Sequence, residues 1–206
     1  MGETALCPHR SLSNLPGASV QHLVTTLDRL GLEFSIVGGV AVALISTPRF
    51  TADIDAVLLN IDDRLEWLVA ELAQAGYSGR TSDPVAFARR TRVLTLVDPY
   101  EVGIDLMLGL LPFDEDLVRK SNRVRIEGDL DVPVACAEHL VVMKAVAWRP
   151  KDVEDIRQIV LANPSLDKRY VMSTFSEYAE LLEEPERIGE LARLLGPQDG
   201  SDGLDR

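Results

Sequence analysis

The chain has 206 residues, 46% hydrophobic and 26% charged, and this length and composition are typical of one globular domain with a small appendage. Its formal net charge of −12 repels phosphate backbones over a Debye length of about 8 Å at physiological ionic strength, which disfavours generic nucleic-acid binding. Two cysteines, Cys7 and Cys136, are too few for a disulfide framework and lack the spacing of a zinc site, so we expect a reducing, cytoplasmic location.

The N-terminal segment is predicted to be a loose arm followed by a helix. Residues 1–18 contain several helix-breaking residues, and Ser19 is a candidate cap for a helix over residues 20–30 that Gly31 ends. No charged start followed by an uninterrupted apolar run is present in this part of the sequence, so we expect neither a signal peptide nor a membrane partner.

A strand, a glycine turn and a short helix come next. Residues 34–37 are apolar enough for a buried strand, Gly38 and Gly39 predict a tight turn, and residues 40–45 begin a helix. A glycine turn that leads into a helix N-terminus exposes backbone N–H groups, which can bind phosphate oxygens.

Acidic and apolar residues then alternate over residues 52–59, which predicts a strand with Asp53 and Asp55 on one face. Two later strands are expected over residues 92–97 and 101–108, and the second contains Asp105 between Ile104 and Leu106. The other predicted elements are a helix at 62–75, a helix at 114–120, a hairpin at 124–132, and helices at 137–148, 151–161, 166–183 and 186–195.

The order of these elements predicts an α+β fold, a mixed sheet flanked by helices with a C-terminal helical subdomain. We expect the sheet domain to cover residues 1–135 and the helical subdomain residues 136–196. The polar residues 197–206 are expected to form a disordered tail.

The three aspartates are candidate ligands for divalent metal ions. Asp53 and Asp55 can reach one ion because they point the same way from a strand, and Asp105 on a neighbouring strand can complete a site for a second. Carboxylate oxygens are the hard ligands that Mg²⁺ requires, with Mn²⁺ as an alternative. Positive charge for a triphosphate would come from Arg49 and Lys144.

The run VGGVAVALISTPRFTADID, which ends at Asp55, resembles the nucleotide-binding signature of the polymerase-β-like nucleotidyltransferases. Arg49 and Thr51, which precede the aspartates, are similar to a pattern in the AbiEii-type toxins and related uncharacterised nucleotidyltransferases. The resemblance continues through VGIDLMLG around Asp105 and VPVACAEHLVVMKAVAWRPKDVEDI, and it covers roughly residues 34–160.

The resemblance implies a nucleotidyltransferase-type sheet, a nucleoside triphosphate as substrate and transfer of a nucleoside monophosphate to a hydroxyl group. It also implies that Lys144 binds the triphosphate and that Asp152 or Asp155 is a further functional acid in this region. The implied role is the toxin of a toxin–antitoxin pair that acts on tRNA or on a protein. One departure is Gly39, which stands where many relatives have a serine that contacts phosphate.

Other interpretations remain open. Arg49 and Thr51 can simply organise the loop, and Asp152 and Asp155 can simply pair with neighbouring cations. The chain can also be a nucleotidyltransferase that modifies an aminoglycoside or lincosamide antibiotic, since an acidic protein suits a cationic drug, or a catalytically silent binding module or antitoxin. Basic runs around residues 89–92 and 119–125 offer a local RNA surface or are merely solvated.

Overall fold

A computed structural model describes residues 16–47, 50–127 and 129–196, and the chain divides into two compact units, Met1–Cys136 and Ala137–Arg206. Each unit is described by itself. Most of the predicted arm and all of the predicted tail lie outside the described residues. No helix in the described part of the chain is both long and apolar enough to cross a membrane.

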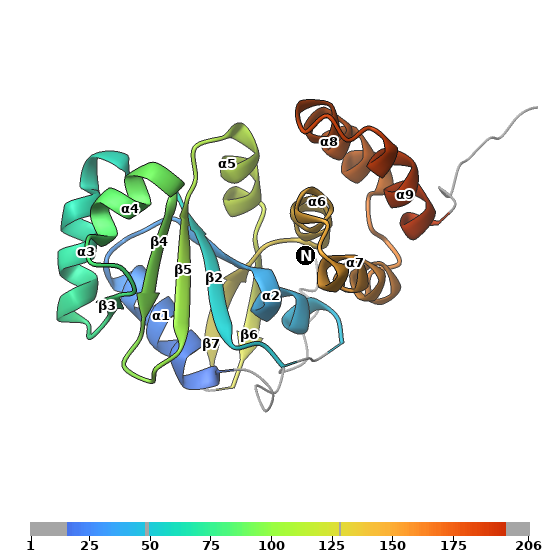
Figure 1. The fold of residues 1–206 in the computed structure, drawn as a ribbon. Helices are drawn as coiled ribbons and strands as arrows, with labels where there is room; N and C mark the ends of the chain where they lie inside the picture. The colour runs from blue at the N-terminus through green and yellow to red at the C-terminus, as the bar shows by residue number, and fades with distance from the viewer. Residues whose placement is uncertain (1–15, 48–49, 128, 197–206) are drawn as a thin grey trace, which may run out of the picture. The chain divides into compact units, whose positions relative to one another are not determined.

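The first unit is built on one mixed sheet (Figure 1). In the described residues the strand order is β3-β4-β5-β2-β1-β7-β6, in which β1 pairs antiparallel with β2 while β2 and β5 run parallel. The strands are β1 (Phe34–Val37), β2 (Asp53–Leu58), β3 (Ser78–Gly79), β4 (Val93–Val97), β5 (Gly103–Leu108), β6 (Asn122–Ile126) and β7 (Leu130–Val134).

The central strands form because their apolar residues can be buried by helices. All four residues of β1 are buried, whereas β4 and β5 alternate buried and half-buried positions, as expected for strands whose two faces differ. Ile54, Ile104 and Leu106 are fully buried on the face opposite the aspartates. Burial of this face therefore fixes the register that brings the aspartates together.

Five α-helices accompany the sheet in the described residues, and α1 lies against one face of it (Figure 1). Helix α4 packs on β4 and on α3, and α2 packs on β1 and β2. Their bounds are α1 (Gly17–Arg29), α2 (Gly38–Ile45), α3 (Leu65–Gln74, after the 3₁₀ turn Asp62–Arg64), α4 (Pro84–Thr91) and α5 (Pro112–Arg119).

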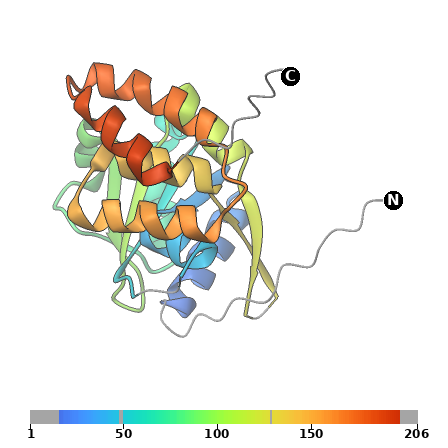
Figure 2. The same ribbon diagram turned by 90° about the vertical axis from the view of Figure 1, so that its right-hand side faces the viewer.

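The second unit is helical (Figure 2). Helix α6 packs against α7 and α8, and α9 packs against α7 and α8. Phe175 is fully buried and its ring stacks on that of Trp148 with 6.4 Å between centroids. The bounds are α6 (Ala137–Ala147), α7 (Pro150–Ala162), α8 (Lys168–Leu181) and α9 (Glu186–Leu195).

The predicted α+β class, a mixed sheet flanked by helices, is confirmed. The prediction that Ser19 caps the first helix is wrong, because α1 begins earlier and Ser19 is buried in its first turn. Gly38 and Gly39 do not form a separate turn but are the first two residues of α2. Strand β3 and helix α4 were not predicted, although Asp83 accepts a hydrogen bond from the Ala86 N–H as an ordinary N-cap.

Candidate active site

Three carboxylates meet on one face of the central strands. Asp53 and Asp55 alternate with buried Ile54 on β2, so both point away from the core. The parallel pairing of β2 with β5 sets Asp55 directly opposite Asp105, on strands that lie about 5 Å apart. The predicted convergence of the strands that carry these aspartates is thus present in the structure.

Two glycines make room for the carboxylates. Gly38 has φ +62°, and a Cβ atom added to it would overlap the Asp55 carboxylate. A Cβ atom added to Gly103, the register partner of Asp53, would likewise overlap the Asp53 carboxylate. Only glycine fits at Gly38, because both the backbone conformation and the close approach exclude a side chain.

The first turn of α2 lies beside this cluster, since Gly38 touches Asp55. Val37 occupies the N-cap position and its apolar side chain makes no capping hydrogen bond. A helix begins with N–H groups that lack intrahelical acceptors, and these groups attract anions. The turn can therefore present phosphate-binding donors next to the metal-binding candidates.

Arg80 contacts the cluster and was not predicted from the sequence. Its guanidinium pairs with the Asp105 carboxylate, and both side chains are about one-third exposed, 34% and 30%. Arg80 directly follows β3, and its N–H donates to the Thr95 carbonyl at 3.0 Å. No spacing pattern in the sequence links Arg80 to Asp105, because the link depends on a two-residue strand pairing with β4.

The loop before β2 is only partly described. Thr51 donates from its hydroxyl to the Asp53 carbonyl at 3.2 Å, so its observed bond is to the backbone and not to a carboxylate. This contact agrees with the interpretation that Thr51 organises the loop. Arg49, the predicted phosphate ligand, lies outside the described residues.

Lys144 lies inside the helical unit in a network of buried charges. Its Nζ is 3.0 Å from Asp152 and 2.8 Å from Asp155, and Asp152 also bonds to the Arg149 guanidinium at 2.6 Å. Lys144 is 6% exposed and Asp152 is fully buried. Two carboxylates therefore already neutralise the predicted triphosphate-binding ammonium, and the predicted nucleotide roles of Lys144, Asp152 and Asp155 stay predictions.

The same network controls the ionisation of Asp152. Burial acts to raise the pKa of this carboxyl, but hydrogen bonds from Arg149 and Lys144 outweigh burial and hold the pKa below its ordinary value. A depressed pKa in the folded state stabilises the fold above the unfolded-state pKa of about 3.9. That stabilisation is lost as the pH falls through the lower folded-state pKa.

The donor set of Asp53, Asp55 and Asp105 suits a hard divalent cation, since all six oxygens are carboxylate oxygens on one face of the sheet. Among the described residues, however, no three His, Cys, Asp or Glu side chains are arranged so that they could hold one metal ion. The carboxylate of Asp105 instead pairs with Arg80. The metal-ligand roles of the three aspartates stay predictions.

Most residues of the two basic runs have acidic partners, so neither run is a bare phosphate-binding surface. The ion pairs are Arg89–Glu66, Arg92–Asp62, Arg119–Glu115, Lys120–Asp116 and Arg125–Asp131. Such pairs reduce the local positive potential that RNA binding would need.

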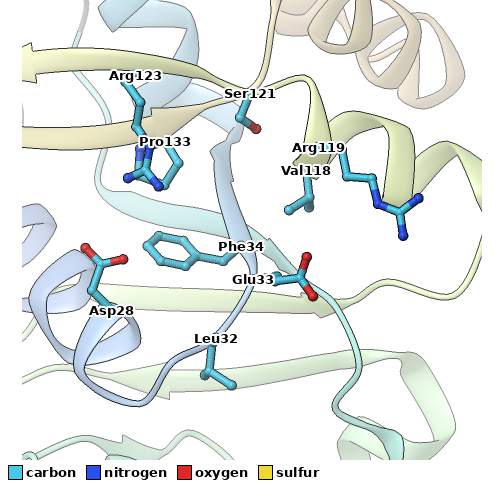
Figure 3. Close-up of a pocket in the computed structure, with 9 residues that line it drawn as sticks. All are labelled: Asp28, Leu32, Glu33, Phe34, Val118, Arg119, Ser121, Arg123 and Pro133. Carbon is cyan, nitrogen blue, oxygen red and sulfur yellow. The ribbon is translucent and has the colours of Figure 1, made fainter.

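A cavity of about 260 Å³ lies at the other end of β1 from Gly38 (Figure 3). Its walls carry both signs of charge, with Arg123 above Phe34 and Asp28 beside it. It contains none of the three aspartates, and its full lining is Asp28, Leu32, Glu33, Phe34, Val118, Arg119, Ser121, Arg123 and Pro133.

Comparison with known families decides the class of the protein. A family model described as a nucleotidyltransferase of unknown function (DUF6036) matches residues 17–188. The chain belongs to this nucleotidyltransferase family. No curated protein sequence matches the chain.

Solved nucleotidyltransferases share the fold of this family member. The antibiotic-resistance factor ANT(2'')-Ia, solved in complex with adenylyl-2''-tobramycin, is 15% identical with a TM-score of 0.56, over 80% of this chain and 97% of that one. The lincosamide adenylyltransferase LnuA, solved with lincomycin, is 12% identical with a TM-score of 0.53, over 71% and 98%. An antigenic nucleotidyltransferase-like protein from Paracoccidioides brasiliensis is 18% identical with a TM-score of 0.50, over 84% and 91%.

Replacement of Gly38 by alanine tests the close approach to Asp55. The variant is expected to lose about 2–3 kcal/mol of unfolding free energy in urea, because the new methyl group strains the backbone and displaces the carboxylate. Gly31→Ala is the matched control, since Gly31 has φ +67° but nothing within 4 Å of the added Cβ. Equal losses in the two variants would show that Asp55 contributes nothing to the constraint.

Lys144→Met tests whether the buried network supports the helical unit. Removal of the ammonium takes a counter-charge from each of the two buried carboxylates, so we expect a loss of about 3 kcal/mol of unfolding free energy. Chemical unfolding followed by tryptophan fluorescence, to which Trp67 and Trp148 both contribute, measures it. The exposed Lys151→Met is the control, and an unchanged stability of Lys144→Met would contradict a structural role.

Proposed function

We propose that the protein is a metal-dependent nucleotidyltransferase that moves a nucleoside monophosphate from a nucleoside triphosphate to a hydroxyl group. The observation that carries this proposal is the register of β2 and β5, which sets Asp55 opposite Asp105 directly beside the first turn of α2. Membership of a nucleotidyltransferase family supports it.

Asp53, Asp55 and Asp105 are the residues that would hold Mg²⁺ or Mn²⁺. When bound there, the ions would neutralise the triphosphate oxygens and the charge that develops on pyrophosphate. The register of the two strands supports this assignment, because it sets Asp55 opposite Asp105 on adjacent strands.

Gly38 and Gly39 would bind the phosphates through their backbone N–H groups at the start of α2. The absence of a Cβ atom at Gly38 lets a phosphate approach the backbone closely, as it lets Asp55 approach in this structure. Arg49, two residues before Thr51, remains the candidate cation for the same phosphates.

Asp105 would orient the acceptor hydroxyl and accept its proton. The acceptor oxygen forms a bond to the α-phosphorus, and the bond between the α-phosphorus and the bridging oxygen breaks. The electron pair leaves with pyrophosphate, and the nucleoside monophosphate stays on the acceptor. The position of Asp105 on a different strand from Asp53 supports the division between acceptor and nucleotide sides.

We favour a small cationic acceptor. A net charge of −12 attracts cations and repels polyanions, and most residues of the basic runs are already paired with acidic ones. The solved relatives ANT(2'')-Ia and LnuA, which share the fold, are described with antibiotic ligands. The resemblance to the AbiEii-type branch favours a toxin that modifies tRNA or a protein, in company with an antitoxin, as the second candidate.

Transfer and acceptor class can be measured together. The purified protein is incubated with each α-³²P nucleoside triphosphate, Mg²⁺, and either an aminoglycoside and lincosamide panel or total cellular RNA and protein. We expect the wild type to label a small molecule, and we expect Asp53→Asn to transfer about a hundredfold less label. Asp63→Asn, which removes the same charge at an exposed position outside the cluster, should label as the wild type does.

The outcomes separate the candidates. Label on RNA or protein would favour the toxin role, whereas label that persists in Asp53→Asn would refute the proposed metal site. Absence of label on every acceptor with the wild type would favour a silent binding module.

A further inference from the structure

Arg80 contacts a carboxylate of the cluster. Its guanidinium pairs with Asp105, and its Nη1 lies 3.3 Å from the position that a Cβ atom on Gly103 would take. The Asp53 carboxylate approaches that same position. Arg80 thus pairs with Asp105 and lies near the Asp53 carboxylate, in the region where the proposed divalent cation would bind.

The backbone of Arg80 is held by the sheet. Its N–H donates to the Thr95 carbonyl at 3.0 Å, and Thr95 is the register partner of Asp105 on β4. The main chain of Arg80 is therefore fixed on the far side of β4 from Asp105, and its long side chain reaches across β4 to the carboxylate. Because the sheet holds the backbone of Arg80, its side chain can move away from Asp105 without any change in the fold.

The charges explain why this pair forms. Asp55 and Asp105 face each other on adjacent strands, and two carboxylates at that spacing repel each other unless a cation lies near them. A guanidinium keeps its charge at any pH at which the protein is folded, so Arg80 cannot leave Asp105 by losing its own proton. A cation that binds the same carboxylate can displace it.

We propose that Arg80 and the divalent cation compete for Asp105, so that Arg80 sets the metal affinity of the site. This inference rests on the proposed metal-dependent function and names a regulator of the same site. Without metal, Arg80 offsets the charge of the carboxylates. When metal binds, the ion replaces the guanidinium on Asp105, and the free energy of the ion pair is subtracted from the free energy of metal binding.

Direct measurement of Mn²⁺ binding tests the competition without any reaction. Free Mn²⁺ is followed by electron paramagnetic resonance during titration of the full chain, with no nucleotide present. Arg80→Gln is expected to bind Mn²⁺ about three- to tenfold more tightly than the wild type, because the partly exposed ion pair between Arg80 and Asp105 no longer has to be broken. Arg80→Lys, which retains a charge but not the fork geometry, should fall between them.

Two further variants separate this effect from a general change in charge. Arg89→Gln removes an arginine from the exposed pair with Glu66 on the same unit, and it should bind Mn²⁺ as the wild type does. In an Asp105→Asn background, Arg80→Gln should no longer change the affinity for Mn²⁺, because the carboxylate for which Arg80 and the metal compete is absent.

Thermal unfolding gives a second readout. Arg80→Gln should be less stable than the wild type without Mn²⁺, and the difference in stability should shrink at saturating Mn²⁺.

An affinity of Arg80→Gln that equals or falls below that of the wild type would overturn the competition, and a fall would make Arg80 a ligand that assists the metal site. An equal gain in Arg89→Gln would also overturn it, since the gain would then reflect net charge alone. Failure of both wild type and Arg80→Gln to bind Mn²⁺ would refute the proposed metal site itself, which the other outcomes leave intact.

Discussion

Burial of the apolar face of β2 and β5 is the interaction on which the sheet unit depends. Burial of Ile54, Ile104 and Leu106 fixes the register of β2 and β5, and that register forces Asp55 opposite Asp105. Two acids opposite each other on adjacent strands add no stability to the sheet, because like charges repel. The hydrophobic face therefore provides the free energy that holds the two acids opposite each other, and Arg80 offsets part of their repulsion.

The two units balance buried or crowded acids in different ways. In the helical unit Lys144 and Arg149 neutralise Asp152, which is fully buried. Loss of one cation would leave this carboxylate less well neutralised, and water could not take the place of the lost partner. In the sheet unit Arg80 and Asp105 are each about one-third exposed, so water can replace either partner. The first arrangement is suited to permanent support, and the second to exchange of one cation for another.

The sequence predicted the elements whose pattern is local and missed the features that depend on the fold. Alternation along β2 and β5 was enough to place Asp53, Asp55 and Asp105 on strands, because a period of two residues is a direct consequence of strand geometry. Strand β3 has two residues and no pattern, so Arg80 could not be assigned. The start of α2 at Gly38 was missed because glycine ordinarily predicts a turn, whereas here contact with Asp55 demands it.

The fold alone does not identify the acceptor, since structures 12–18% identical to this chain share only the arrangement of elements. The proposed preference for a cationic acceptor rests on charge, because charge acts on a molecule before any contact forms. A polyanion that approached this protein would meet a net charge of −12 and basic side chains that mostly have acidic partners, such as Arg125 with Asp131. A cationic molecule would meet the opposite field, and its amines would approach the same acids that Arg80 now neutralises in part.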